Sequence, residues 1–267
     1  MKALATNRPV SFVLILTIAW FVLLAVFMGI ASSALREPYG SATTGTAGRL
    51  AVTACVLFLV WRLGWLEASG VARLGSWRVW VLASGGMIYF AGASLFSFYG
   101  KVTFGLSSLI RLPDLHAAVM THFAAGLSEE LLFRGLALYA LIRVWGNTTQ
   151  GIIRSVAFTS LLFAALHITQ VIMPGASLPS LLFLTLETCI VSIWWGALVV
   201  SGRSIWPAVM LHFAVNAAVA VQGLTVPMVE PAILAYRRIL WFSIPLGVLG
   251  IVMLVREDPH RIGRIGD

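Results

Sequence analysis

The sequence predicts an all-α fold: a polytopic integral membrane protein built as a bundle of about eight transmembrane helices. Hydrophobic residues make up 60% of the 267 residues, charged residues only 10%, and the mean hydropathy is +0.95. A soluble domain usually carries about 25% charged residues, and a soluble core of this length would leave large apolar patches in water. Apolar runs long enough to cross a bilayer recur from residue 11 to residue 255 without the alternation typical of strands.

These runs occupy most of the chain, so we expect one membrane domain over residues 1–267. The first run, from Phe12 to Ala31, has the full spanning length and is longer than the core of a signal peptide. Basic residues are more frequent at the helix ends that lie on the same side of the membrane as the N-terminus. Because basic residues favour the cytoplasmic side, we expect both termini in the cytoplasm. The expected spans are approximately 11–33, 49–66, 79–100, 116–145, 154–173, 179–200, 204–222 and 236–255.

The formal net charge of +8 also fits a membrane protein. Basic residues stand mostly singly between apolar runs, which is typical of topology-setting charges and of contacts with lipid headgroups. Cys55 and Cys189 lie in apolar runs far apart in the sequence, so we expect buried thiols and neither a disulfide nor a metal site. The predicted surroundings are therefore the lipid bilayer, and nucleic acid is excluded as a partner.

A few polar residues interrupt the expected spans. An ionisable side chain in a membrane-spanning helix costs several kcal/mol, so each one is a functional hypothesis. The polar residues fall on the fourth to seventh runs and are His122, Glu129, Glu130, Arg134, His167, Glu187, His212 and Asn216.

The adjacent glutamates of the fourth run can take different tasks. Glu129 and Glu130 point about 100° apart on a helix. Glu130 and Arg134 are four residues apart and can pair on one face, which lowers the cost of burying either charge. Two carboxylates this close in a low dielectric cannot ionise equally well unless Arg134 compensates one of them. Two carboxyl groups that differ in how readily they ionise suit general acid–base chemistry.

The two histidines on later runs add hydrogen-bonding groups. His212 and Asn216 share one helix face and can donate hydrogen bonds to a developing oxyanion, whereas His167 is isolated in an apolar helix. Taken singly, each residue is more often structural, because histidine and asparagine commonly bridge membrane helices. Their combination with two glutamates on three long helices favours a site. Glu187 is either a partner of Arg134 or structural, and we interpret His122 as structural.

These motifs resemble the signature of the CAAX-protease and bacteriocin-processing (CPBP, or Abi) family, whose eukaryotic members are the Rce1-type prenyl-protein endopeptidases. The agreement lies in the order and spacing of Glu129-Glu130-x-x-x-Arg134, Phe163-x-x-x-His167 and His212-x-x-x-Asn216. It covers about residues 115–220, which we expect to form the catalytic core. The helices over residues 1–101 have no assigned role in this resemblance.

The resemblance implies an intramembrane endopeptidase that acts on a membrane-associated protein or peptide precursor, in a chain that we expect in the bacterial cytoplasmic membrane. It also implies a role for each motif residue. Glu129 and His167 would activate a water, His212 and Asn216 would stabilise the oxyanion, Glu130 would position or polarise the site, and Arg134 would hold the carboxylates.

Metal dependence leaves two alternatives. Glu129, His167 and His212 could form a zinc site with one open position. The HExxH pairing of many zinc proteases is absent, however, and a glutamate–histidine pair can activate water without a metal. We therefore favour a glutamate-type protease with no cofactor over a zinc metalloprotease.

Two other functions are compatible with parts of this pattern. Buried glutamate, histidine and arginine also build the relays of proton-coupled transporters, although the sequence shows no inverted repeat or paired broken helices. A non-proteolytic scaffold or immunity protein of the same fold is the other alternative, since fold does not determine activity.

Overall fold

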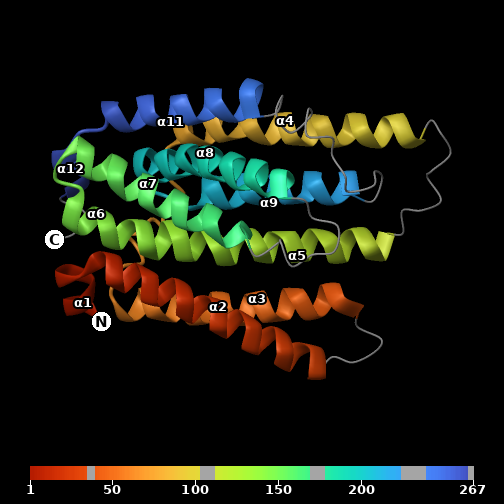
Figure 1. Cartoon of the computed structure of the whole chain (residues 1–267), viewed down its shortest axis with the longest axis horizontal. Helices are drawn as coiled ribbons and strands as arrows, with labels where there is room; N and C mark the ends of the chain where they lie inside the picture. Colours follow the sequence, from red (N-terminus) through yellow and green to blue (C-terminus); the bar gives the residue numbers. More distant parts are fainter. Residues whose placement is uncertain (35–39, 103–111, 169–177, 224–238, 264–267) are drawn as a thin grey trace.

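A computed structural model of the chain describes residues 1–34, 40–102, 112–168, 178–223 and 239–263. These residues form long helices that lie side by side along one axis (Figure 1), with no strand among them, which confirms the predicted helical bundle. The elements are α1 (Lys2–Asn7), α2 (Pro9–Ala34), α3 (Gly40–Arg62), α4 (Trp77–Val102), α5 (Leu112–Glu130), the π-helix η2 (Leu131–Leu138), α6 (Tyr139–Trp145), α7 (Thr149–Leu166), α8 (Leu178–Gly202), α9 (Trp206–Gly223), the π-helix η4 (Ile239–Ser243), α11 (Ile244–Arg256) and α12 (Pro259–Gly263).

Each predicted span overlaps a helix or a helical series. Among the described residues, four helices are long and apolar enough to cross a membrane: Pro9–Ala34, Thr43–Arg62, Thr149–Leu166 and Leu181–Gly202. The predicted spans 79–100 and 204–222 correspond to α4 and α9, 116–145 to the series α5–η2–α6, and 236–255 to η4–α11. The end of the fifth span, 169–173, and residues 236–238 of the eighth lie outside the described residues.

The second predicted span, 49–66, is wrong at both ends, because α3 runs from Gly40 to Arg62. The early end has a clear cause in Gly64, whose φ of +71° ends the helix. The Gly64 amide donates to the Trp61 carbonyl and the Trp65 amide to the Val60 carbonyl, the pair of bonds that closes a helix at a left-handed glycine. At its other end α3 begins at Gly40, nine residues before Arg49, so Arg49 lies within the helix and not at its end.

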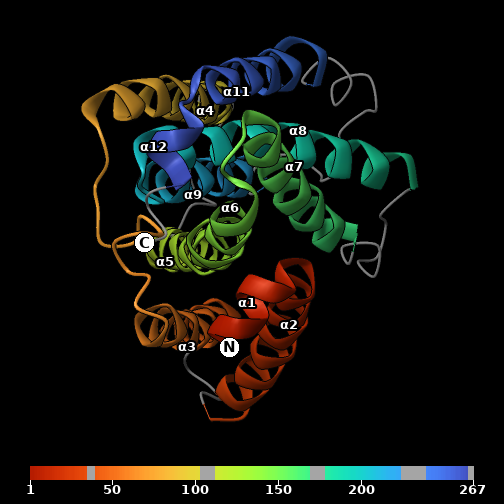
Figure 2. The same cartoon turned by 90° about the vertical axis from the view of Figure 1, so that its left-hand side faces the viewer.

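The helices are stacked in layers, with α5 near the middle (Figure 2). Helices α2 and α3 pack together on one side, α5 lies between α3 and α9, and α9 packs against α4. Helix α8 contacts α7, α9 and α11. The helix that carries both glutamates is thus covered on two sides, which removes its polar residues from lipid.

The segment between α3 and α4 passes along the end of the bundle and packs against the turn between α8 and α9. Its backbone carbonyls at Val71 and Arg73 accept hydrogen bonds from the Trp206 indole and the Ser204 hydroxyl. Gly70 has a φ of +80° and lies very close to the turn between α8 and α9. A Cβ atom at Gly70 would be 2.8 Å from the Ser204 Cα atom. The close approach requires glycine and anchors the start of α9.

Both ends of the described chain lie at the same end of the bundle. Helices α1 and α12 each pack against α6 (Figure 1). This arrangement agrees with termini on one side of the membrane, while their placement in the cytoplasm stays a prediction.

Gly126 allows α5 and α9 to approach closely. A Cβ atom at this position would lie 3.3 Å from the Phe213 amide nitrogen and 3.4 Å from the Val209 carbonyl oxygen, both backbone atoms of α9. Three residues further along α5 is Glu129, and α9 carries His212 beside this contact. The spacing of these two helices therefore depends on the absence of a side chain at Gly126.

Replacing Gly126 with leucine should separate α5 from α9 and destabilise the fold by about 1–3 kcal/mol, the usual cost of overpacking. Thermal unfolding in detergent measures this loss. The control is Gly85→Ala in α4, where a Cβ atom would meet nothing within 4 Å; it should leave the melting temperature unchanged or raise it, because alanine favours a helix. A Gly126→Leu protein as stable as the wild type would contradict the close-packing argument.

Candidate active site

A buried ionic network links α5, η2 and α9. The Glu130 Oε1 atom lies 2.9 Å from the Arg134 Nη1 atom and 2.9 Å from the His212 Nδ1 atom. The Glu130 side chain is 0% exposed. Charge-assisted hydrogen bonds of this kind are needed to offset the cost of burying a carboxylate. The pairing of Glu130 with Arg134 that the spacing predicts is therefore present, and His212 joins it.

Arg134 is enclosed by aromatic rings and one hydroxyl. Its guanidinium donates to the Ser192 hydroxyl of α8 at 2.7 Å. The guanidinium carbon lies 4.6 Å from the ring centre of Phe163 and 5.6 Å from that of Trp195, distances at which a cation is attracted to a ring. Ser192 and Trp195 were not predicted, because nothing distinguishes them from other residues of an apolar helix.

The π-helix η2 begins directly after Glu130. Its hydrogen bonds run to the fifth residue along the chain, and within it Arg134 keeps the ion pair with Glu130. All eight residues from Leu131 to Leu138 are buried. π-helical turns are frequent at functional sites.

Glu129 differs from its neighbour in its surroundings. Its side chain is 20% exposed, and its Oε2 atom lies 3.7 Å from the His212 Nε2 atom. This distance exceeds that of a direct hydrogen bond. The two adjacent glutamates thus lie on opposite sides of one imidazole: Glu130 is fully enclosed at Nδ1, and Glu129 is partly accessible at Nε2.

His167 follows the last residue of α7 and lies next to this network. Its Nδ1 atom is 3.1 Å from the Phe163 carbonyl oxygen. The Phe163 ring lies between the two histidines, with centroids 5.0 Å from His167 and 5.6 Å from His212. Glu129 and His212 both act electrostatically on His167. The structure therefore brings His167 to the same region, although no direct bond joins it to either glutamate.

Asn216 lies one turn beyond His212 on α9, as the spacing predicts. Its side chain is half-buried, and it forms no hydrogen bond with a described residue. The amide is thus placed one turn from the histidine, and no described residue uses its hydrogen-bonding groups.

Two other polar residues of the expected set lie apart from the centre. Glu187 accepts a hydrogen bond from the Ser243 hydroxyl at 3.4 Å, while Arg134 pairs with Glu130; Glu187 is therefore not the partner of Arg134. His122 is half-buried on α5, two turns before Glu129. A further contact supports α5 from the N-terminal helices, since the Trp20 indole donates to the Ser128 hydroxyl at 3.3 Å.

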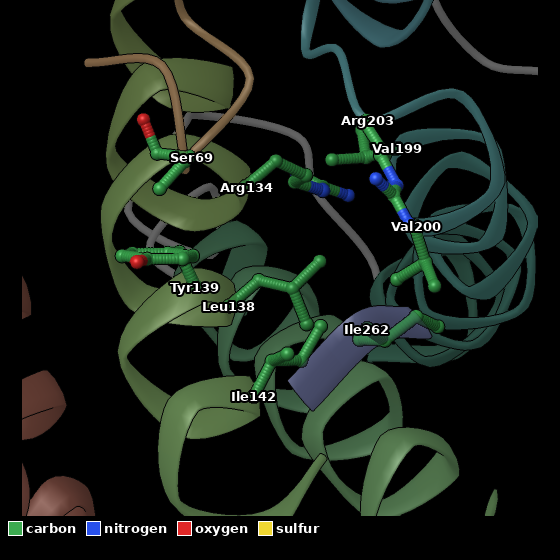
Figure 3. Close-up of a pocket in the computed structure, with 10 residues that line it drawn as sticks. Ser69, Arg134, Leu138, Tyr139, Ile142, Val199, Val200, Arg203 and Ile262 are labelled. Atoms are coloured by element: carbon green, nitrogen blue, oxygen red, sulfur yellow. The ribbon is translucent and has the colours of Figure 1, made fainter. Parts of the chain in front are cut away.

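A small cavity of about 40 Å³ reaches Arg134 from the end of the bundle that carries α12. Figure 3 shows the Arg134 guanidinium pointing into it, among Ser69, Tyr139, Arg203 and Ile262. A space of this size with several polar groups can hold a water molecule. The face of Arg134 away from Glu130 can therefore be hydrated.

The possible zinc ligands do not form a compact group. Among the described residues, no three histidine, cysteine or acidic side chains lie close enough together to hold a metal ion. The His212 Nδ1 atom is bound by Glu130, and the His167 Nδ1 atom lies against a backbone carbonyl. Both contacts leave the Nε2 atoms open to other partners, so the separation of the side chains is the observation against a zinc site of Glu129, His167 and His212.

The fold and the centre define a helical integral membrane protein with a buried glutamate–arginine–histidine network and one partly accessible glutamate. Residues 111–218 match the family model described as type II CAAX prenyl endopeptidase Rce1-like. The chain thus carries an Rce1-like domain over these residues, which confirms the predicted resemblance and supports a protease. No curated protein and no solved structure matches the chain.

The network makes a prediction about stability. Replacing Arg134 with methionine removes the cation and leaves the buried Glu130 carboxylate with one partner fewer. Removing one member of a buried ion pair costs about 3–5 kcal/mol, so we expect markedly earlier unfolding in a detergent denaturation series. The double variant Glu130→Gln/Arg134→Met should recover part of the loss, because no uncompensated charge remains. Equal stability of the wild type and Arg134→Met would show that the pair is not needed for folding.

Proposed function

We propose that this protein is an intramembrane endopeptidase that hydrolyses a peptide bond of a membrane-associated protein or peptide precursor. The observation that carries the proposal is the placement of Glu129 and Glu130 on opposite sides of the His212 ring, at 3.7 Å and 2.9 Å. One carboxylate can orient the histidine while the other remains accessible for chemistry. The match over residues 111–218 supports peptide hydrolysis as that chemistry.

Glu130 acts as a positioning residue for His212. An ionised carboxylate only accepts hydrogen bonds, so the Nδ1 atom of His212 carries the proton and the Nε2 atom faces Glu129. Arg134 compensates the charge of Glu130 through a second bond to the same oxygen. This pattern, a buried carboxylate that holds a histidine in one tautomer and orientation, recurs in hydrolytic sites.

Glu129 acts as the general base. Its carboxylate removes a proton from a water, and the oxygen of that water forms a bond to the carbonyl carbon of the peptide. His167 helps to hold the carboxylate and the water. When the tetrahedral intermediate collapses, the C–N bond breaks and Glu129 returns the proton to the leaving amine.

His212 and Asn216 stabilise the oxyanion of the intermediate. A proton taken up from solvent at the Nε2 atom makes His212 doubly protonated, and this Nε2–H can donate to the oxyanion together with the Asn216 amide. With the proton of the water on Glu129, the charges of Glu130, Arg134, His212 and the oxyanion then sum to zero, which suits a site of low dielectric. The mechanism uses no metal, and zinc bound by Glu129, His167 and His212 is the alternative that an inhibitor experiment can test.

The substrate reaches the site from the bilayer or its interface, because the centre lies on helices inside the membrane domain. We place both termini in the cytoplasm, on the basis of the basic residues near α1 and α12. A scaffold protein or a proton-coupled transporter would need none of the hydrolytic steps, so cleavage itself separates the three functions.

Glu129→Gln should abolish cleavage, with a decrease of at least about 100-fold, because general-base catalysis contributes that much or more. New C-termini in the membrane proteome of cells that carry the wild-type or variant protein provide the measurement. Glu187→Gln is the matched control, a carboxylate of α8 that bonds Ser243, and its products should equal those of the wild type. Full cleavage by a folded Glu129→Gln protein would exclude this mechanism.

Metal removal should leave the activity intact. We expect purified protein in proteoliposomes, treated with 1,10-phenanthroline and then dialysed, to cleave an identified substrate at the rate of the untreated protein. Loss of activity that is restored by zinc and by no other addition would establish the metal-dependent alternative.

A further inference from the structure

Arg203 has a backbone conformation that is rare for a residue with a side chain. It lies in the turn between α8 and α9 with a φ of +52°, and no other described residue except glycine has a positive φ. Such a conformation is costly, persists only where the surrounding structure holds it, and is frequent at sites that bind ligands. The segment after α3 packs against this turn, because a Cβ atom at Gly70 would lie 2.9 Å from the Arg203 carbonyl carbon. The fold thus maintains a strained turn around an arginine that is not part of the catalytic centre.

The Arg203 side chain reaches the small cavity beside Arg134. Both arginines line this space of about 40 Å³, together with Ser69, Tyr139 and apolar side chains of η2, α6, α8 and α12. Figure 3 shows the two arginines entering from different segments, Arg134 from η2 and Arg203 from the residue after α8. The cavity therefore combines two cations with a largely apolar wall.

The charges around the cavity favour an anion. No aspartate or glutamate is among the described residues that line it. Arg134 donates to Glu130 and Ser192 through two of its nitrogen atoms, and a guanidinium group has further N–H donors for another acceptor. Two guanidinium groups that border one space of low dielectric create a positive potential there. An anion in this space accepts charge-assisted hydrogen bonds, whereas a water carries no charge to offset theirs.

The size of the space selects a small anion. About 10–15 Å³ is enough for one water, so the cavity accommodates about three waters, or one ion of the size of chloride with a water. Apolar side chains such as Val199 and Ile262 bound the rest of the space. A bulky anion such as gluconate, or a lipid headgroup, therefore does not fit.

We propose that this cavity binds a small monovalent inorganic anion, such as chloride, between Arg134 and Arg203. The site takes no part in the peptide-cleaving steps and goes beyond the proposed endopeptidase function. The anion contacts Arg134 on the side away from Glu130 and joins the strained turn after α8 to η2. An ion from solution thus stabilises the arginine that holds Glu130 beside His212.

Anion binding can be measured without a peptide substrate. The full-length protein in detergent is unfolded thermally at constant ionic strength, while potassium gluconate is replaced stepwise by potassium chloride or potassium bromide. A ligand of the folded state raises the melting temperature with a saturable dependence on its concentration. The wild type should gain about 3 °C or more at a chloride concentration tenfold above the Kd, and bromide should act in the same way.

Three variants assign the effect to the cavity. Arg203→Gln removes one of the two cations, and Ala68→Leu fills the space while it keeps both cations. Each should reduce the gain in melting temperature with chloride to less than about 1 °C, and the transition in gluconate shows that the variant is folded. Arg62→Gln, an exposed cation at the end of α3, is the matched control and should keep the whole gain.

The line width of the chloride NMR signal is a second readout, because exchange with a protein-bound ion broadens it. The wild type should show excess broadening that bromide displaces, and Arg203→Gln should lose it. Equal melting temperatures of the wild type in chloride and gluconate, or equal broadening in the wild type and Arg203→Gln, would overturn the site. A gain retained in both Arg203→Gln and Ala68→Leu would do the same. Neither readout depends on cleavage, so failure of the endopeptidase proposal would leave this result intact.

Discussion

The Glu130 carboxylate is the group on which the arrangement of the catalytic half depends. It is fully buried, and one of its oxygens accepts hydrogen bonds from Arg134 and His212. Because an uncompensated charge in this environment would cost several kcal/mol, η2 and α9 must both present their polar side chains to α5. Ser192 extends the same network to α8. One buried carboxylate thus specifies the relative rotation of three neighbouring helical segments.

The different environments of two adjacent residues follow from helix geometry. Side chains of neighbouring residues point about 100° apart, so the direction that buries Glu130 leaves Glu129 partly accessible. The rings of Phe163 and Trp195 lie against the Arg134 guanidinium, and His212 lies between the two carboxylates. A glutamate held for orientation and a glutamate free for proton transfer therefore arise from a single pair of residues, without a second element that carries an acid.

The N-terminal helices support this centre and are not a separate appendage. Trp20 of α2 donates to Ser128, the residue before Glu129, and Thr46 of α3 bonds Thr121 on α5. The segment after α3 also anchors the start of α9 through Ser204 and Trp206. The sequence contained no signal for these contacts, because serine, threonine and tryptophan are common in membrane helices and none of the pairs is close in the chain.

Composition and run length by themselves determined that the chain is a bundle of membrane helices, and spacing determined which residues could share a face. The ion pair of Glu130 with Arg134 was predictable because both residues belong to one helical turn. The partner of His212, the aromatic enclosure of Arg134 and the separation of Glu187 from Arg134 were decided by tertiary structure alone. Each depends on how one helix is rotated against another. That rotation results from close contacts such as that of Gly126 in α5 with the backbone of α9, and residue spacing within one helix does not contain such contacts.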